Sequence, residues 1–142
     1  MLNFARRLIV QETLENKSRG AETPEAFHAS DRLRPHLATL MGNNGFRALL
    51  MRSLALANAE VPWLRAVHVK ADGSLDGLKA LHLHLGPEEF LEGRVFLLAE
   101  LLGLLVAFVG PNLTEHLVGE IWPQNSPADL DFSNGGKNEE TK

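Results

Sequence analysis

The chain has 142 residues and a formal net charge of −4 at pH 7, which fits a single acidic domain large enough to bury a core. It contains no cysteine, which excludes disulfides, thiolate catalysis and cysteine-based metal sites, and its acidic balance disfavours nucleic acid as a partner. The amino-terminal residues lack the apolar core of a signal peptide, so we expect a cytoplasmic location.

The charge is unevenly distributed along the chain. Residues 1–70 carry ten Lys and Arg against six Asp and Glu, whereas residues 71–142 carry four against twelve. We interpret this asymmetry as a basic half that packs beside an acidic half, rather than as an acidic surface for a basic partner.

The amino-terminal residues predict a first helix over residues 3–16. Phe4, Leu8 and Leu14 mark an irregular apolar stripe, and Glu12 is expected on the outside of the helix. Residues 23–25, Thr-Pro-Glu, then combine a capping residue, a proline for the first helical position and an acidic first turn. They predict the start of a second helix.

Two helices are predicted between residues 23 and 60. Pro35 is expected to kink or split the first of them, because proline lacks the N–H that the helix needs. Residues 42–45, Gly-Asn-Asn-Gly, predict a turn, and Val61-Pro62 ends the next helix. That helix has the cleanest amphipathic pattern of the chain, formed by Phe46, Leu49, Leu50, Ser53, Leu54 and Ala57.

Residues 65–85 allow two interpretations. The alternation over residues 66–69 and the turn-like Asp72-Gly73 suggest a short β-hairpin. Leucines at positions 78, 81 and 85 lie near helical spacing, and a lone two-stranded ribbon is barely stable. We favour an extended segment, a turn and one short helix.

The most apolar stretch predicts a central buried helix over about residues 94–109. From Val95 to Val109 only Glu100 is charged, so this helix should be surrounded on all sides. The run is shorter than the roughly 20 residues that span a membrane, so no membrane partner is expected. Gly110-Pro111 ends it and starts a helix over residues 111–122, which predicts a helical hairpin.

The predicted fold is therefore all-α, with about five helices packed around the helix at about 94–109. Residues 1–123 are expected to form one helical domain. Residues 124–142 are polar and rich in Asn, Ser and Gly, which predicts a mostly disordered tail.

Two features of the central helix suggest specific contacts. Ala99, Gly103 and Ala107 form a stripe of small residues, which we interpret as close packing within one core. A buried carboxylate needs a partner, and a hairpin that turns at residues 110–111 brings Glu100 level with Trp122. We predict that Glu100 is buried and accepts a hydrogen bond from Trp122 or from an arginine of the basic half.

Sequence patterns provide few candidate site residues and no catalytic motif. Glu100, His116 and Trp122 are the candidate ligand-binding residues, although His116 is better interpreted as a surface residue. His82 and His84 are the candidate metal ligands, because in a strand they would share one face; in a helix the site disappears. No cofactor is expected, since glycine-rich nucleotide-binding motifs are absent.

Several stretches carry a resemblance. GFRALL (45–50), EVPWLRAV (60–67), KADGSL (70–75) and LLGLLVAFVG, followed by LTEHLVGEIWP, resemble a family of small, uncharacterised bacterial helical proteins. The resemblance covers about residues 33–123 and implies a bacterial cytosolic protein, with no known activity and no functional residue to carry over.

These observations favour a small helical interaction or oligomerisation module without catalytic activity of its own. A homo-oligomer or a protein partner is expected, because we expect the short helices of one chain to leave part of the apolar run at 95–109 uncovered. The alternative is a protein that binds a small apolar ligand, or an enzyme that uses Glu100 and a nearby histidine. A deep cavity with a polar lip around Glu100 would favour this alternative.

Overall fold

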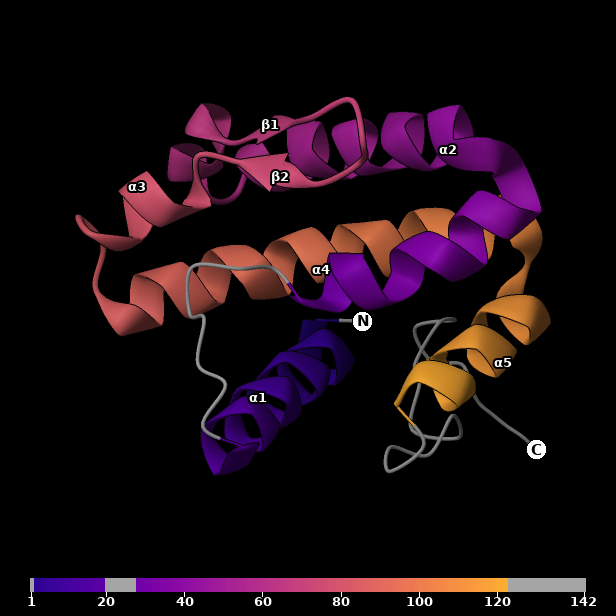
Figure 1. The fold of residues 1–142 in the computed structure, drawn as a ribbon, viewed down its shortest axis with the longest axis horizontal. Helices are drawn as coiled ribbons and strands as arrows, with labels where there is room; N and C mark the ends of the chain where they lie inside the picture. Colours follow the sequence, from indigo (N-terminus) through magenta and orange to yellow (C-terminus); the bar gives the residue numbers. More distant parts are fainter. Residues whose placement is uncertain (1, 20–27, 123–142) are drawn as a thin grey trace.

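The computed structural model describes residues 2–19 and 28–122 and has an all-α fold (Figure 1). Four helices pack together with a small two-stranded hairpin, so the predicted all-α class is confirmed, while the number of packed helices is four rather than about five. The predicted helix start at residues 23–25 and the tail at 124–142 lie outside the described residues. The four helices are α1 (Leu2–Arg19), α2 (His28–Asn58), α4 (Pro87–Val109) and α5 (Pro111–Ile121).

Helix α4 lies at the centre, and α1, α2 and α5 all pack against it. It begins at Pro87, earlier than the predicted start, because the preceding residues form a capping structure. Gly86 is the N-cap, and its backbone N–H donates to the Glu89 carboxylate at 3.1 Å. The acidic first turn, Glu88 and Glu89, also complements the positive end of the helix dipole.

Helix α2 is interrupted at Gly42, within the predicted turn at 42–45. Gly42 has φ 79° and ψ 162°, a backbone conformation that favours glycine, and it is the only non-helical residue within α2. The backbone stays helical at Pro35, so the helix is not split there. Because Pro35 has no N–H, the carbonyl of Asp31 lacks its usual helical donor. Both residues are exposed, so this carbonyl is accessible to water.

The segment between α2 and α4 combines both interpretations of the sequence. A short antiparallel hairpin pairs His68 with Asp76 and Val69 with Leu75, and a short helix follows it. The favoured prediction of an extended segment, a turn and one short helix is right about the helix, but the extended segments pair as a hairpin, which packs against α2 and so is not a lone ribbon. The elements are η1 (Pro62–Ala66), β1 (His68–Val69), β2 (Leu75–Asp76) and α3 (Leu78–His82).

Gly93 allows the η1 segment to lie directly on α4. A Cβ at this position would be 2.1 Å from the Cζ2 atom of Trp63. The Trp63 ring in turn stacks on Phe90, with ring centroids 5.7 Å apart and an interplanar angle of 14°. The ring of Trp63 therefore occupies the space that any larger side chain at Gly93 would need.

The joint between α4 and α5 agrees with the predicted helical hairpin. Gly110 has φ 92°, and Pro111 takes the first position of α5. The Gly110 carbonyl accepts from the Thr114 backbone N–H at 3.2 Å and from Thr114 Oγ1 at 2.8 Å. Among the described helices, none is long and apolar enough to cross a membrane.

An ion pair joins the basic amino-terminal half to the acidic carboxy-terminal half, as the charge distribution suggested. Arg6 Nη2 on α1 donates to both carboxylate oxygens of Glu92 on α4, at 2.8 and 3.0 Å. Both side chains are 43% exposed, so this pair orients the helices more than it stabilises them.

Candidate interaction surface

Trp122 meets a buried carboxylate, but the carboxylate is Glu12 on α1 rather than Glu100. Trp122 Nε1 donates to Glu12 Oε2 at 3.1 Å, and Arg32 Nη1 on α2 donates to the same oxygen at 3.2 Å. Glu12 is 5% exposed and Trp122 is 1% exposed. The predictions that Glu12 faces solvent and that Glu100 accepts from Trp122 are therefore wrong.

Arg94 of α4 is a second cation that interacts electrostatically with Glu12. Burial lowers the pKa of Arg94, and the negative charge of Glu12 acts in the opposite direction. The guanidinium lies 5.1 Å from the centroid of the Phe90 ring, while that of Arg32 lies 5.4 Å from the Trp122 ring. The carboxylate of α1 thus interacts with Arg32 of α2, Arg94 of α4 and Trp122 at the end of α5, which is typical of a structural polar cluster.

Glu100 lies elsewhere, on the outer side of α4. Its side chain is half-buried, and it makes no hydrogen bond or ion pair with the other residues that the structure describes. A hairpin fixes the level of a residue along the helix axis, but it does not fix the direction in which the side chain points. Position along the helix axis alone therefore does not place the Glu100 side chain beside Trp122.

His116 is on the surface, as expected, and pairs with the next turn of its own helix. Its Nε2 atom lies 3.3 Å from Glu120 Oε2, with the histidine side chain 66% exposed. The other carboxylate oxygen of Glu120 lies 3.9 Å from His36 Nδ1 on α2. Among the described residues, no hydrogen bond or ion pair joins the candidate ligand-binding residues Glu100, His116 and Trp122 to one another.

The two candidate metal ligands do not share a strand. His82 is the last residue of helix α3, and its side chain is outside the described part of the structure; His84 follows the helix and is exposed. The strand that the metal prediction requires is therefore not formed there. Within residues 2–19 and 28–122, no group of three or more His, Asp or Glu could hold a metal ion.

The prediction that the central helix is surrounded on all sides is wrong for its last turns. Gly103 and Ala107 are exposed, and the Phe108 side chain is 70% exposed. A Cβ on Gly103 would meet no atom within 4 Å. The other helices pack against the opposite side of α4, where Leu101, Leu102 and Leu105 are buried. The small residues Gly103 and Ala107 therefore do not serve close packing within this chain.

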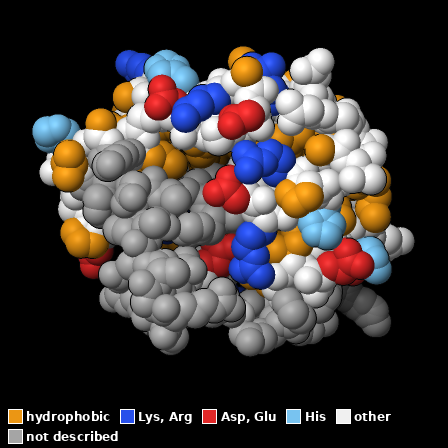
Figure 2. All heavy atoms as spheres, viewed as in Figure 1, with side chains coloured by type: hydrophobic (Ala, Val, Ile, Leu, Met, Phe, Trp, Pro, Cys, Tyr) orange, Lys and Arg blue, Asp and Glu red, His pale blue; other side chains and the backbone are white. Residues whose placement is uncertain are grey.

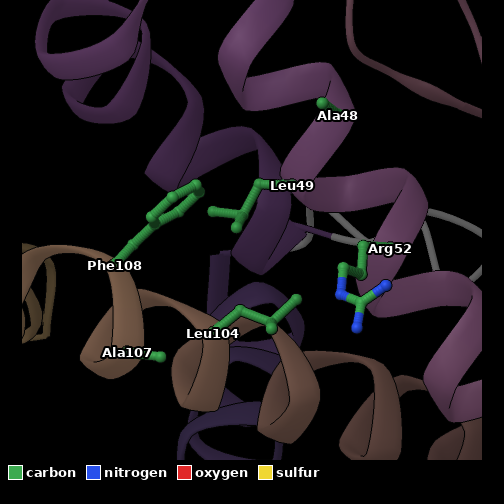
Figure 3. A pocket seen from close by; sticks show the side chains of 6 residues that line it. All are labelled: Ala48, Leu49, Arg52, Leu104, Ala107 and Phe108. Atoms are coloured by element: carbon green, nitrogen blue, oxygen red, sulfur yellow. The ribbon is translucent and has the colours of Figure 1, made fainter.

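An open groove lies between this exposed stripe of α4 and the second half of α2 (Figure 3). Its volume is about 320 Å³. The Phe108 ring points toward Leu49 across the groove, and Arg52 extends from α2 toward α4. Arg52 has no hydrogen bond or ion pair with another described residue. The lining residues are Ala48, Leu49, Arg52, Leu104, Ala107 and Phe108.

None of the sequence-predicted site residues lines this groove. Two sequence features point to this surface. One is the apolar run at 95–109, which is too apolar all round for short helices of one chain to cover, and the other is the pair of small residues at 103 and 107. Comparison of the chain with protein-family models, curated proteins and solved structures finds no match. The resemblance to small bacterial helical proteins therefore stays a prediction.

Proposed function

We propose that this protein is a small helical module that works by self-association, without catalytic activity of its own. The supporting observation is the uncovered apolar stripe at Gly103, Ala107 and Phe108 on a helix that is otherwise the centre of the core. Exposed apolar patches of this kind mark surfaces for protein contacts. The bacterial cytoplasm is the location that we propose for it.

The polar groups support this proposal over the enzymatic alternative. Trp122 and His116 already have structural partners, Glu12 and Glu120. The groove is lined by apolar side chains and Arg52, and Glu100 is not part of its lining. This groove is therefore not the polar-lipped cavity around Glu100 that the enzymatic alternative needs.

The surface charge gives no support to a nucleic-acid partner. Figure 2 shows acidic and basic side chains interspersed on the described part of one face. Binding to a phosphate backbone uses a stripe or cluster of basic residues instead. Together with the net charge of −4, this mixed face favours a protein partner.

Light scattering after size-exclusion chromatography tests the proposal. The chain mass is 15.6 kDa, and we expect a dimer or larger species whose population grows between low and high micromolar concentration. A single species of monomer mass at several hundred micromolar would contradict self-association. The measurement is made without detergent, so that the exposed stripe is not covered by surfactant.

A second candidate function is the binding of a small apolar ligand with an acidic end. The groove favours it, because its volume is near the lower limit of about 300 Å³ for ligand pockets and Arg52 supplies a cation. Displacement of a fluorescent fatty acid from the wild type, but not from Arg52→Glu, would support this candidate. No saturable binding up to high micromolar concentration of the fatty acid would exclude it.

A further inference from the structure

We infer that the groove between α2 and α4 receives Phe108 from a second copy of the chain, in a twofold dimer whose two α4 helices lie antiparallel. This inference rests on the proposed self-association and assigns the surface and geometry of the contact. Phe108 forms one wall of the groove and is 70% exposed, so each copy offers both an aromatic side chain and a space for one. A twofold contact needs a surface that is complementary to itself in this way.

The helix geometry brings the two features together. In an antiparallel contact centred near Leu104, each residue lies over a partner residue equally far on the other side of that centre. A helix rises about 1.5 Å per residue, so the Cα of Phe108 lies about 6 Å along the axis from the centre. Side chains on a helix lean toward its amino terminus, and the ring therefore reaches back over the partner's Leu104.

The same geometry pairs two charges. Arg52 and Leu104 both line the groove, and Glu100 lies one turn before Leu104 on the same side of α4. The partner's Glu100 is then about 6 Å along the axis from the contact centre, a distance that an arginine and a glutamate side chain together span. Neither Arg52 nor Glu100 has a hydrogen bond or ion pair with the described residues of its own chain.

The backbone of α4 is suited to close approach at this place. Gly103 next to the centre has open space around its Cα, and Ala107 presents only a methyl group. Small residues of this kind let two helices approach closely, and large side chains at the same positions would hold them apart. The twofold axis repeats the aromatic contact and the ion pair, so each dimer contains two of each.

Analytical ultracentrifugation of the full chain tests the contact with four variants. Phe108→Ala, Arg52→Glu and Glu100→Arg should each raise the dimer dissociation constant at least about 30-fold, because each change is made twice per dimer. The double variant Arg52→Glu with Glu100→Arg restores the pair with exchanged charges and should regain most of the affinity. All these side chains are partly or largely exposed in one chain, so circular dichroism should report an unchanged fold.

Matched controls remove an equally exposed side chain or charge elsewhere. Leu83, which is 77% exposed beyond α3, is changed to Ala, and the exposed Arg65 of η1 is changed to Glu. Both controls should associate as the wild type does. Because the chain has no cysteine, Gly103→Cys should form a disulfide-linked dimer on mild oxidation, whereas Leu83→Cys should not.

The outcomes separate the inference from the proposed function. A wild type that dimerises, with Phe108→Ala, Arg52→Glu and Glu100→Arg dimerising equally well, overturns the groove contact but leaves self-association in place. Single variants that dissociate without recovery in the double variant overturn the pairing of Arg52 with Glu100. A monomeric wild type overturns both.

Discussion

Replacing Glu12 by glutamine tests whether the buried cluster at α1 holds the fold together. Glu12 Oε2 accepts from Trp122 Nε1 and from Arg32 Nη1, and its charge also raises the pKa of Arg94 against the effect of burial. Glutamine has nearly the same shape and keeps one carbonyl acceptor. The change therefore removes the negative charge and leaves the packing in place.

The expected loss of stability is about 2–3 kcal/mol. Removing one partner of a fully buried ion pair costs about 3–5 kcal/mol, and a hydrogen bond to a charged group contributes about 1.5–3 kcal/mol. The Arg32 side chain is 38% exposed, so water recovers part of its solvation and the expected value lies below the buried limit. For a domain of this size, this corresponds to a fall in Tm of roughly 6–12 °C.

Glu92→Gln is the matched control, since it makes the same chemical change in an ion pair between α1 and α4. Both partners of that pair are 43% exposed, and the expected loss is below about 1 kcal/mol. Urea unfolding followed by circular dichroism at one protein concentration measures both variants. If Glu12→Gln loses no more stability than Glu92→Gln, the cluster is not a structural centre and the reasoning from its burial is wrong.

Three further substitutions have defined expectations. Gly93→Ala should lower the free energy of unfolding by about 1–2 kcal/mol in urea, because its methyl group collides with Trp63; unchanged stability would mean that the ring moves aside freely. Gly103→Ala should raise the free energy of unfolding by up to about 1 kcal/mol at protein concentrations too low for self-association, since the site is open and alanine favours the helix. A lower free energy of unfolding would contradict the open site. Hydrogen bonds from the side chain and the backbone N–H of Ser74 lower the pKa of Asp72, so the ionised form stabilises the turn. This contribution is lost as pH falls through the lowered pKa, and the stability difference between wild type and Asp72→Asn should therefore shrink below pH 3.8; a difference that is constant from pH 7 into acid would contradict the assignment.

Local signals along the chain predicted most of the fold. The break at Gly110-Pro111 and the end of α2 before Pro62 follow from residues whose backbone preferences are strong. The sequence predicts a break in α2 both at Pro35 and at the turn at 42–45, and the backbone leaves the helical conformation only at Gly42. Proline on an exposed helix face loses a hydrogen bond that water replaces, and the sequence alone does not say which face is exposed.

The buried partner of Trp122 was not predictable from local spacing. Glu12 and Trp122 are 110 residues apart, and α1 has an irregular apolar stripe that leaves the direction of Glu12 undefined. Packing between segments that are distant in the same chain decides which carboxylate is buried in the core. Pattern reasoning therefore identified correctly that Trp122 is buried and needs an acceptor, and assigned the wrong acceptor.

Glu100 is not the buried polar residue that its apolar neighbours in the sequence suggest. The only charge in a run of fifteen residues was interpreted as a buried group that needs a partner, yet it marks the side of α4 that the rest of the chain leaves open. Gly103, Leu104 and Phe108 follow it at helical spacing on that side, and Phe108 is the most exposed large apolar side chain of the described part of α4. A charged residue on the same face as such an apolar stripe favours exposure of that face to water or its contact with a protein partner. On this reasoning, reversing the charge of Glu100 should leave the stability of one chain unchanged and alter only its association, which is the opposite of the effect expected for Glu12.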